Sequence, residues 1–336
     1  MKFFLLSFLL AFSISQIRYG EDIRVQEEIA SIKFYEFRLT PEIQKPRPRL
    51  SQLPNSDFPA SDWLKLVDDN KKIFSLSIPG THETCARYGG VLTECQEWTI
   101  EEQLLNGVRY LDIRCRHISD VFMIHHGLVY QQLSFGAGVR DVCINFLKNH
   151  PSEFIFMQIK EEYEATNNTR TFSETMQSYI EGNEEFFYLK EDSPTLEKVR
   201  GKIVILRRFD PVYSPQGNYL QFQDNKIFTS QTTITARIQD CYVVPTMFER
   251  STKWNHVSQI LDEAANNTDK DKLFVNFGSG TSPLCFPYVV AEYITPKIGY
   301  YLEVTNPNTF VGVIMFDFVN LYYNDVIEIL AKRNFI

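Results

Sequence analysis

Residues 77–84 read SIPGTHET, the stretch that says most about the fold and chemistry of this chain. It ends an apolar, β-like segment with a turn that presents His82 beside Glu83. A histidine placed after a strand in this way can take up a proton near neutral pH. Two later runs, YLDIR and MIHHG, end in the same manner on Arg114 and around His126. Three strand ends therefore offer two histidine sites and an arginine.

This set of side chains is typical of phosphodiester cleavage by a neighbouring hydroxyl group. Two imidazoles can divide the work of general base and general acid. A guanidinium can bind an anion through two hydrogen bonds and does not lose its charge. A single histidine after a strand is more often a turn or core residue than a catalyst, so the prediction depends on the constellation and not on His82 alone.

Short apolar runs alternate along the chain with longer segments of helical composition. Most of these runs are too continuous for half-exposed strands, so we expect buried parallel strands. They lie at residues 73–77, 108–114, 121–125, 154–160, 202–207, 273–277 and 311–316. Candidate helices between them lie at residues 100–106, 138–148, 167–181 and 257–265. The alternation predicts an α/β fold, a parallel barrel with helices outside it.

Polar residues follow the carboxyl ends of these runs. The strands of a parallel barrel have their carboxyl ends on one face, where the active site lies, so we expect these residues to converge. They are His82, Glu83, Arg114, His126, Lys160, Glu162, Arg208 and Asp317.

The start of the chain predicts a secretory signal peptide at residues 1–15. A basic residue precedes an apolar run over residues 3–12, and residues 13–15 offer small side chains where a signal peptidase reads. The run is too short to span a bilayer, and a retained anchor is the alternative. Residues 16–62 follow as an N-terminal extension containing the extended run KPRPR, and residues 63–336 form one catalytic barrel domain. We therefore expect a secreted protein.

The cysteines and the glycosylation sequons agree with that compartment. The six cysteines fit disulfide formation, but the sequence does not determine their pairing. The chain has no CxxC pair, so a zinc site made of cysteines is not expected. Two NNT sequons, at Asn167 and Asn266, lie in polar stretches, as glycosylation acceptors in loops would.

The charge of the chain argues against two classes of partner. Its formal net charge is −8 at pH 7, which disfavours nucleic acid and disfavours attraction to anionic lipid by bulk charge. We expect contact with a membrane to be local and apolar instead. Two clusters offer such contact, one formed by Val91, Leu92 and Trp98 and one by residues 284–288.

Five motifs, in this order and spacing, resemble the X domain of phosphatidylinositol-specific phospholipases C, and most closely the secreted bacterial branch. They are SIPGTH at residues 77–82, LDIR at 111–114, HHG at 125–127, NHPSE at 149–153 and GKIVIL at 201–206. The similarity runs from Trp63 to the C-terminus. It implies a single irregular TIM barrel that cleaves phosphatidylinositol or glycosylphosphatidylinositol to diacylglycerol and an inositol cyclic phosphate.

The resemblance also implies a role for each catalytic position. His82 resembles the general base that deprotonates the inositol 2-hydroxyl, and Asp317 matches the carboxylate that orients this base. His126 resembles the general acid that protonates the departing diacylglycerol oxygen. Arg114 matches the arginine that neutralises the developing charge on phosphorus, in the place of a calcium ion. No cofactor is therefore expected.

The same resemblance implies a subsite for the inositol ring. Lys160, Glu162, Arg208 and Asp240 fall where the family contacts inositol hydroxyls, and Tyr242 falls where a tyrosine ring packs on the sugar face. A polyol is bound well by several charged donors and acceptors with one flat apolar wall. No clear strand leads into Asp240 and Tyr242, so their placement rests on the resemblance alone.

The chain departs from the bacterial pattern at two positions. That pattern has aspartate after the first histidine, where this chain has Glu83, which is one methylene longer. In the family this carboxylate supports the arginine and the acid histidine, so its displacement either weakens catalysis or is absorbed by a small shift. The second departure is near Phe222, where the bacterial relatives tend to carry a larger aromatic side chain. Neither departure removes a group that transfers a proton.

Several alternatives remain open from sequence alone. A catalytically weakened secreted barrel that binds inositol lipids would lack a catalytic group, but both histidines and Arg114 are present. A metal-dependent phosphodiesterase would need acidic ligands clustered near His82, and Asp112 and Glu83 are too few. A purely structural barrel is the third alternative. We expect a monomer that meets its lipid substrate at a transient membrane interface, and the sequence does not choose between free phosphatidylinositol and a glycosylated anchor.

Overall fold

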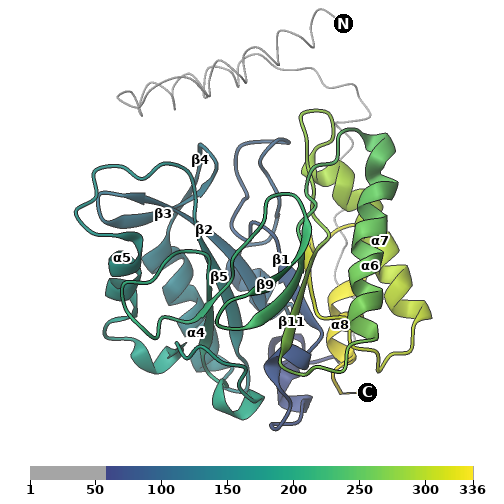
Figure 1. Ribbon diagram of the computed structural model, residues 1–336, viewed down its shortest axis with the longest axis horizontal. Coiled ribbons are helices and arrows are strands. Elements are labelled where there is room, and N and C mark those ends of the chain that lie inside the picture. Colours follow the sequence, from purple (N-terminus) through teal and green to yellow (C-terminus); the bar gives the residue numbers. More distant parts are fainter. Residues whose placement is uncertain (1–57, 336) are drawn as a thin grey trace, which may run out of the picture. The chain divides into compact units, whose positions relative to one another are not determined.

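One curved sheet organises the part of the chain that this computed structural model describes, residues 58–335 (Figure 1). Its parallel strands are, in spatial order, β6 (Phe187–Tyr188), β7 (Ile203–Arg207), β5 (Ile155–Glu161), β2 (Tyr110–Ile118), β1 (Ile78–Thr81), β12 (Val313–Phe316), β11 (Lys272–Phe277) and β10 (Thr235–Gln239). This is the α/β barrel expected from the sequence. The predicted signal peptide and residues 16–57 of the extension lie outside the described residues.

The barrel is irregular where it closes. β8 (Asn218–Tyr219) pairs with β7, and β9 (Ile227–Gln231) pairs antiparallel with β10. Among residues 58–335 no strand ladder joins β8 to β9. Side-chain bonds close the gap instead, because the Tyr219 N–H donates to Thr233 Oγ1 at 2.9 Å and the Gln221 N–H donates to Ser230 Oγ at 3.0 Å.

Two predicted strands are corrected by the structure. Residues 73–77 contain a 3-10 turn, η2 (Ile73–Ser75), and the first strand starts only at Ile78. A short apolar run does not by itself distinguish a strand from a helical turn. The Pro79-Gly80 pair resembles a turn signal but lies inside β1, where a Cβ on Gly80 would approach Met315 Sδ to 2.6 Å.

The run at 121–125 forms a strand, β3 (Val121–His126), but this strand is antiparallel to β2. Only Ser119 and Asp120 separate the two strands, and both residues have positive φ, as in a tight hairpin turn. A parallel partner would need a crossover of a dozen or more residues. β4 (Val129–Ser134) continues this meander by pairing antiparallel with β3.

Helices pack on the outer face of the curved sheet, with α4 and α5 at the left of Figure 1 and α6, α7 and α8 at the right. Their bounds are α3 (Ile100–Leu105), α4 (Asp141–Asn149, preceded by a π-turn η3, Gly136–Arg140), α5 (Phe172–Ile180), α6 (Arg250–Ala265), α7 (Pro287–Val304) and α8 (Val326–Lys332). Further 3-10 turns are η1 (Ala60–Leu66), η4 (Glu184–Phe186), η5 (Leu196–Lys198) and η6 (Met247–Glu249). All four predicted helices are present, and α5 starts later than predicted because Thr171 and Glu174 form its capping box. No helix of the described residues is long and apolar enough to cross a membrane.

The apolar core has two layers, one on each face of the strands. Tyr110 and Phe156 belong to the cluster inside the barrel, whereas Leu111, Ile113 and Met157 belong to the cluster under the helices. Successive side chains of a strand point to opposite faces, and here both faces are buried. This double burial explains why the strands read as continuous apolar runs.

The expected disulfides are not present, because all six cysteines are free thiols. Five of them are buried and Cys241 is half-buried. Burial raises the pKa of Cys85, Cys95 and Cys115 well above the ordinary thiol value. Cys85 and Cys115 therefore behave as small core side chains rather than as cross-linking groups.

Candidate active site

The alternation along each strand places the charged side chains in the mouth of the barrel. In β2, Tyr110 points into the barrel core and Leu111 and Ile113 point out. Asp112 and Arg114 share the inward parity of Tyr110 and come at the carboxyl end of the barrel. Three other strands repeat this pattern, in which an inward core residue is followed two or four residues later by an inward polar one. The pairs are Met315 and Asp317, Phe156 and Lys160, and Ile238 and Asp240.

A cavity of about 460 Å³ opens at this mouth. Eight of the ten predicted site residues line it: His82, Arg114, His126, Lys160, Arg208, Asp240, Tyr242 and Asp317. The other two stand behind the first layer, where Glu83 pairs with Arg114 and Glu162 pairs with Lys160. The structure therefore brings all ten residues together, while their roles remain predictions.

Strand register positions His82 against Asp317. β1 and β12 are parallel neighbours, and Thr81 lies opposite Phe316, so the next residues of the two strands are side by side. His82 Nδ1 donates to Asp317 Oδ1 at 2.8 Å, since a carboxylate only accepts. Burial would lower the pKa of His82, but Asp317 raises it above its ordinary value. The Nε2 atom is left as the proton acceptor.

Gln96 fixes this pair from behind, and the sequence analysis missed it. Its buried Nε2 donates to the backbone oxygens of both His82 and Phe316, each at 2.8 Å. Gln96 lies in an irregular loop between β1 and α3, where no periodicity or motif marks it. Only the folded chain identifies it as a clamp across the two strand ends.

Two carboxylates hold Arg114 in the cavity. Its Nε and Nη2 atoms donate to Asp112 Oδ2 at 3.2 and 3.0 Å, and its Nη1 atom lies 2.6 Å from Glu83 Oε1. Burial opposes ionisation of Asp112, but Arg114, with His82 and Arg208, lowers the pKa of Asp112 far below its usual range. Asp112 was not among the predicted site residues, although its inward parity with Arg114 could have identified it.

His126 reaches the same cavity from β3, the antiparallel strand. Its Nδ1 atom donates to the backbone oxygen of Thr93 at 2.8 Å, and its Nε2 atom lies 3.7 Å from Glu83 Oε1. The longer side chain of Glu83 thus reaches both Arg114 and His126. Glu83 has a positive φ of 43°, and the effect of its extra methylene on catalysis stays a prediction.

Charged side chains beside Arg114 suit a polyol, since Lys160 is the register partner of Arg114 on the neighbouring strand. Lys160 Nζ donates to Glu162 Oε2 at 2.7 Å, and Glu162 Oε1 accepts the Gly127 N–H at 3.0 Å. Burial raises the pKa of Glu162, but Arg114 and Lys160 lower it below the ordinary value overall. These groups offer fixed donors and acceptors for ring hydroxyls.

The rings of Phe222 and Tyr242 give the same cavity a flat surface. The guanidinium carbon of Arg208 lies 3.4 Å from the centre of the Phe222 ring. The Tyr242 hydroxyl donates to Asp224 Oδ1 at 2.9 Å. A strand that was not predicted, β10, leads to Asp240 and Tyr242. Its sequence TARIQ alternates polar and apolar residues, so it lacked the continuous apolar run used to find the other strands.

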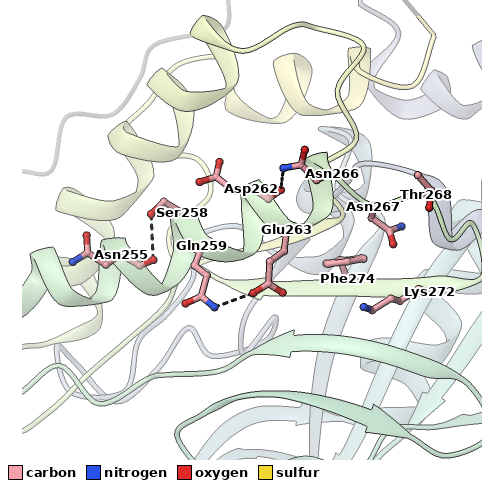
Figure 2. Close-up of a pocket in the computed structure, with 10 residues that line it drawn as sticks. All are labelled: Asn255, Ser258, Gln259, Asp262, Glu263, Asn266, Asn267, Thr268, Lys272 and Phe274. Atoms are coloured by element: carbon pink, nitrogen blue, oxygen red, sulfur yellow. Dashed lines mark hydrogen bonds between the residues drawn. The ribbon is translucent and has the colours of Figure 1, made fainter.

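A larger hollow of about 800 Å³ lies elsewhere, along α6 and β11 (Figure 2). Its polar side chains bond mainly along the helix, as Gln259 Nε2 does to Glu263 Oε1 at 2.8 Å and Asn266 Nδ2 to the Asp262 carbonyl at 2.8 Å. Neither histidine nor arginine lines it. It therefore offers no acid–base pair comparable to the barrel mouth.

Three kinds of comparison with known proteins agree. Residues 73–209 match the family described as phosphatidylinositol-specific phospholipase C, X domain. The chain is 30% identical over 271 residues to a 1-phosphatidylinositol phosphodiesterase of Listeria monocytogenes, covering 76% of this chain and 80% of that protein. It is 27% identical over 298 residues to the enzyme of the same name from Staphylococcus aureus strain Newman, covering 81% of this chain and 94% of that protein. A solved Staphylococcus aureus phosphatidylinositol-specific phospholipase C, the F249X mutant, superposes with a TM-score of 0.76 at 26% identity over 82% of this chain and 98% of that chain.

Proposed function

The chain belongs to the phosphatidylinositol-specific phospholipase C family, and on that premise we propose that it cleaves phosphatidylinositol to diacylglycerol and inositol 1,2-cyclic phosphate. One observation carries the proposal. The His82–Asp317 pair, at 2.8 Å, faces Arg114 and His126 across a single cavity. That arrangement supplies a base, an acid and a fixed positive charge to one phosphorus atom.

The proposed reaction starts at His82. Its Nε2 atom takes the proton of the inositol 2-hydroxyl, and the Asp317 carboxylate stabilises the imidazolium that forms. The resulting oxygen attacks phosphorus. His126 Nε2 then gives a proton to the departing diacylglycerol oxygen, so each histidine has changed protonation state once and the cyclic phosphate is complete.

Arg114 supplies the electrostatic part of the mechanism. Because Asp112 and Glu83 fix its guanidinium, it needs no reorganisation when charge develops on the phosphoryl oxygens. Preorganised charge of this kind is usually the largest single contribution to catalysis. The inositol ring is proposed to lie between the Lys160–Glu162 pair and the Tyr242 ring, with Asp240 and Arg208 at its hydroxyls.

Two loops beside the cavity are proposed to meet the lipid surface. Val243 forms an isolated β-bridge with Thr281, and the Ser282 hydroxyl donates to the Pro245 carbonyl. The β10–α6 and β11–α7 loops therefore form one rim. Exposed apolar side chains gather on this rim: Val243, Met247, Phe248 and Leu284, with Phe248 84% exposed. Leu284 was in a predicted cluster and Phe248 was not. Of the other predicted cluster Leu92 is exposed, but Trp98 packs partly buried against the core.

We further propose that the protein is secreted and carries glycans at Asn167 and Asn266. Both acceptor side chains are exposed, and Asn266 ends α6 beside the hollow of Figure 2, away from the barrel mouth. N-terminal sequencing of material recovered from medium, and a mass shift on glycosidase treatment, test this. An unprocessed N-terminus or an unchanged mass contradicts the corresponding part.

Phosphorus NMR on phosphatidylinositol micelles tests the main proposal. We expect the inositol 1,2-cyclic phosphate resonance to appear as phosphatidylinositol is consumed, and to be absent with His82→Ala protein. Binding to the same micelles without any turnover would instead support the catalytically weakened lipid-binding barrel. A parallel assay on a glycosylphosphatidylinositol-anchored protein distinguishes the two substrate classes.

A further inference from the structure

A buried thiol, Cys95, lines the cavity beside the His82–Asp317 pair of the proposed site. His82, Cys95 and Asp317 each present one ligand atom, and these atoms all lie within 4.8 Å of one another. We propose that this cluster is an inhibitory binding site for a thiophilic divalent metal ion of the zinc class. The inference deepens the proposed function, because the ion would occupy the partners of the proposed base.

Three separate elements bring the ligand atoms together. His82 follows β1 and Asp317 follows β12, whereas Cys95 lies in the loop before α3. The Cys95 backbone is held at both ends, since its N–H donates to the Ala86 carbonyl at 2.8 Å and its carbonyl accepts the Phe318 N–H at 2.7 Å. The thiol is therefore fixed beside the pair and is not a mobile surface group.

Two of the ligand groups have unused capacity. Asp317 Oδ2 is buried and has no hydrogen-bond partner within residues 58–335, although buried polar atoms of this kind are usually paired. The Cys95 Sγ atom makes only a long contact to the Thr93 carbonyl, at 3.7 Å. An ion at this position would satisfy both groups at once.

The donor set selects the kind of ion. One imidazole nitrogen, one thiolate sulfur and one carboxylate oxygen are ligands typical of Zn²⁺, which takes four ligands and accepts water as the fourth. Ca²⁺ and Mg²⁺ require six or more oxygen atoms. The charge of the nearby Arg114 is offset by its ion pairs with Asp112 and Glu83, so it does not by itself exclude a cation. The CxxC pairs of structural zinc sites are not needed, because two of the three ligands are not cysteines.

Binding would stop catalysis through the tautomer of His82. The free protein has the ring proton on Nδ1, where it is donated to Asp317. An ion on Nδ1 moves that proton to Nε2, and the Cys95 thiol releases its own proton to solvent as the thiolate binds. The ring then carries a proton on the atom that must accept one from the inositol hydroxyl.

Inhibition of the full-length protein provides the first test. We expect ZnCl₂ to inhibit turnover of phosphatidylinositol micelles reversibly, with recovery in excess chelator, and CaCl₂ and MgCl₂ to have no such effect. Cys95→Ser keeps the size of the side chain and should keep basal activity, but should raise the half-inhibitory zinc concentration by more than about a hundredfold, because even outer-shell partners contribute about 10–100-fold to metal affinity. Cys241→Ser, the half-buried thiol of the β10 end, is the matched control and should be inhibited like the wild type.

The second test measures metal binding directly and does not depend on turnover. Co²⁺ should give a thiolate-to-metal charge-transfer band in the wild type and in His126→Ala, and none in Cys95→Ser or in Cys95→Ala. The band is expected even where the protein cleaves nothing, so a failure of the proposed reaction is distinguishable from a failure of the metal site. Equal zinc inhibition of wild type and Cys95→Ser, or a wild type without the band, overturns the proposal.

Discussion

The two histidines of the proposed site are held by different kinds of structure. His82 follows β1 and bonds to Asp317 after β12, and these strands are register partners in the barrel. Gln96 closes the pair by bonding the backbone of both strand ends. The position of the base is thus determined by a backbone ladder, the most rigid element available.

His126 is not held by the parallel strand pairing of the barrel. It ends β3, a hairpin strand, and its Nδ1 atom bonds to the Thr93 carbonyl in a loop. That loop is tied to β4 by Gln131, whose Oε1 accepts two backbone N–H groups at 2.9 Å and whose Nε2 donates to the Tyr88 carbonyl at 3.1 Å. The comparison teaches that register positions the base, whereas loop contacts position the acid.

Removing either histidine should have the largest effect on activity. The two variants should also differ, because one removes the proposed base and the other the proposed acid. His82→Ala and His126→Ala are each expected to lower kcat on phosphatidylinositol by about 10²–10⁴-fold. A phosphodiester with a good leaving group, such as an aryl phosphoinositol, does not need a general acid. Activity of His126→Ala should therefore recover on that substrate and activity of His82→Ala should not. Equal recovery of both variants would refute the division into base and acid.

Arg114 stabilises charge on phosphorus whichever group leaves. The loss of activity in an Arg114 variant should therefore be the same on phosphatidylinositol and on the aryl phosphoinositol. Arg114→Ala should lower kcat by about a hundredfold or more on both, the amount typical of removing a transition-state charge partner. Excess EDTA should leave the wild type active, because Arg114 occupies the place where a calcium ion would be needed. Loss of activity in EDTA that calcium restores would assign the charge to a metal instead.

Gln96 and Gln131 each support the surroundings of one histidine, so their variants should show smaller effects of the same kind as the histidine variants. Gln96→Leu and Gln131→Leu should each lower kcat by about ten- to a hundredfold through misplacement of one histidine. Only the Gln131→Leu defect should diminish with the good leaving group. Parallel behaviour of the two variants would show that the two glutamines do not act on separate histidines.

Glu83 lies beside His126 and Arg114. Changing Glu83 should lower kcat less than removing either of the groups that it supports. Glu83→Asp should keep or raise kcat, since it restores the shorter carboxylate of the bacterial pattern, whereas Glu83→Ala should lower it. Steady-state kinetics of the two variants provides the measurement. An Ala variant equal to wild type would remove Glu83 from the catalytic network.

The smallest predicted effect concerns Lys253, which supports the end of β10 beneath the proposed inositol subsite. Lys253 of α6 reaches the end of β10, where Nζ donates to Gln239 Oε1 and to the Cys241 carbonyl, each at 3.0 Å. Burial lowers the pKa of Lys253 from 10.5 to about 8. Between these values the unfolded chain holds more protons than the folded one, so the contribution of Lys253 to stability rises with pH, by at most about 1.4 kcal/mol per pH unit.

Chemical unfolding of wild type and Lys253→Met across that pH range measures the difference. The free energy of unfolding of the wild type relative to the variant should increase as pH rises. A difference that is constant with pH would mean that Lys253 is not held with a lowered pKa.

Much of the site could be predicted from sequence because barrel strands deliver residues by position. The strand runs, their carboxyl-terminal polar groups and the resemblance identified ten residues, and the folded chain brings all ten together. Asp112 could also have been found, since it shares the parity of Arg114. Asp240 and Tyr242 rested on the resemblance alone, because β10 is a polar, alternating strand paired with a hairpin partner.

What the sequence determined by itself is the set of parallel strands and the chemistry at their ends, since continuous apolar runs and strand parity are local properties. The tertiary structure alone decided three things: that β3 turns back antiparallel to bring in His126, that Gln96 bonds the two strand ends at His82 while Gln131 bonds the loop before Thr93, and that the Cys95 thiol lines the cavity beside the base. These contacts join segments through irregular loops. Loops have no period, and their conformations depend on which distant backbone groups they satisfy once the barrel has formed.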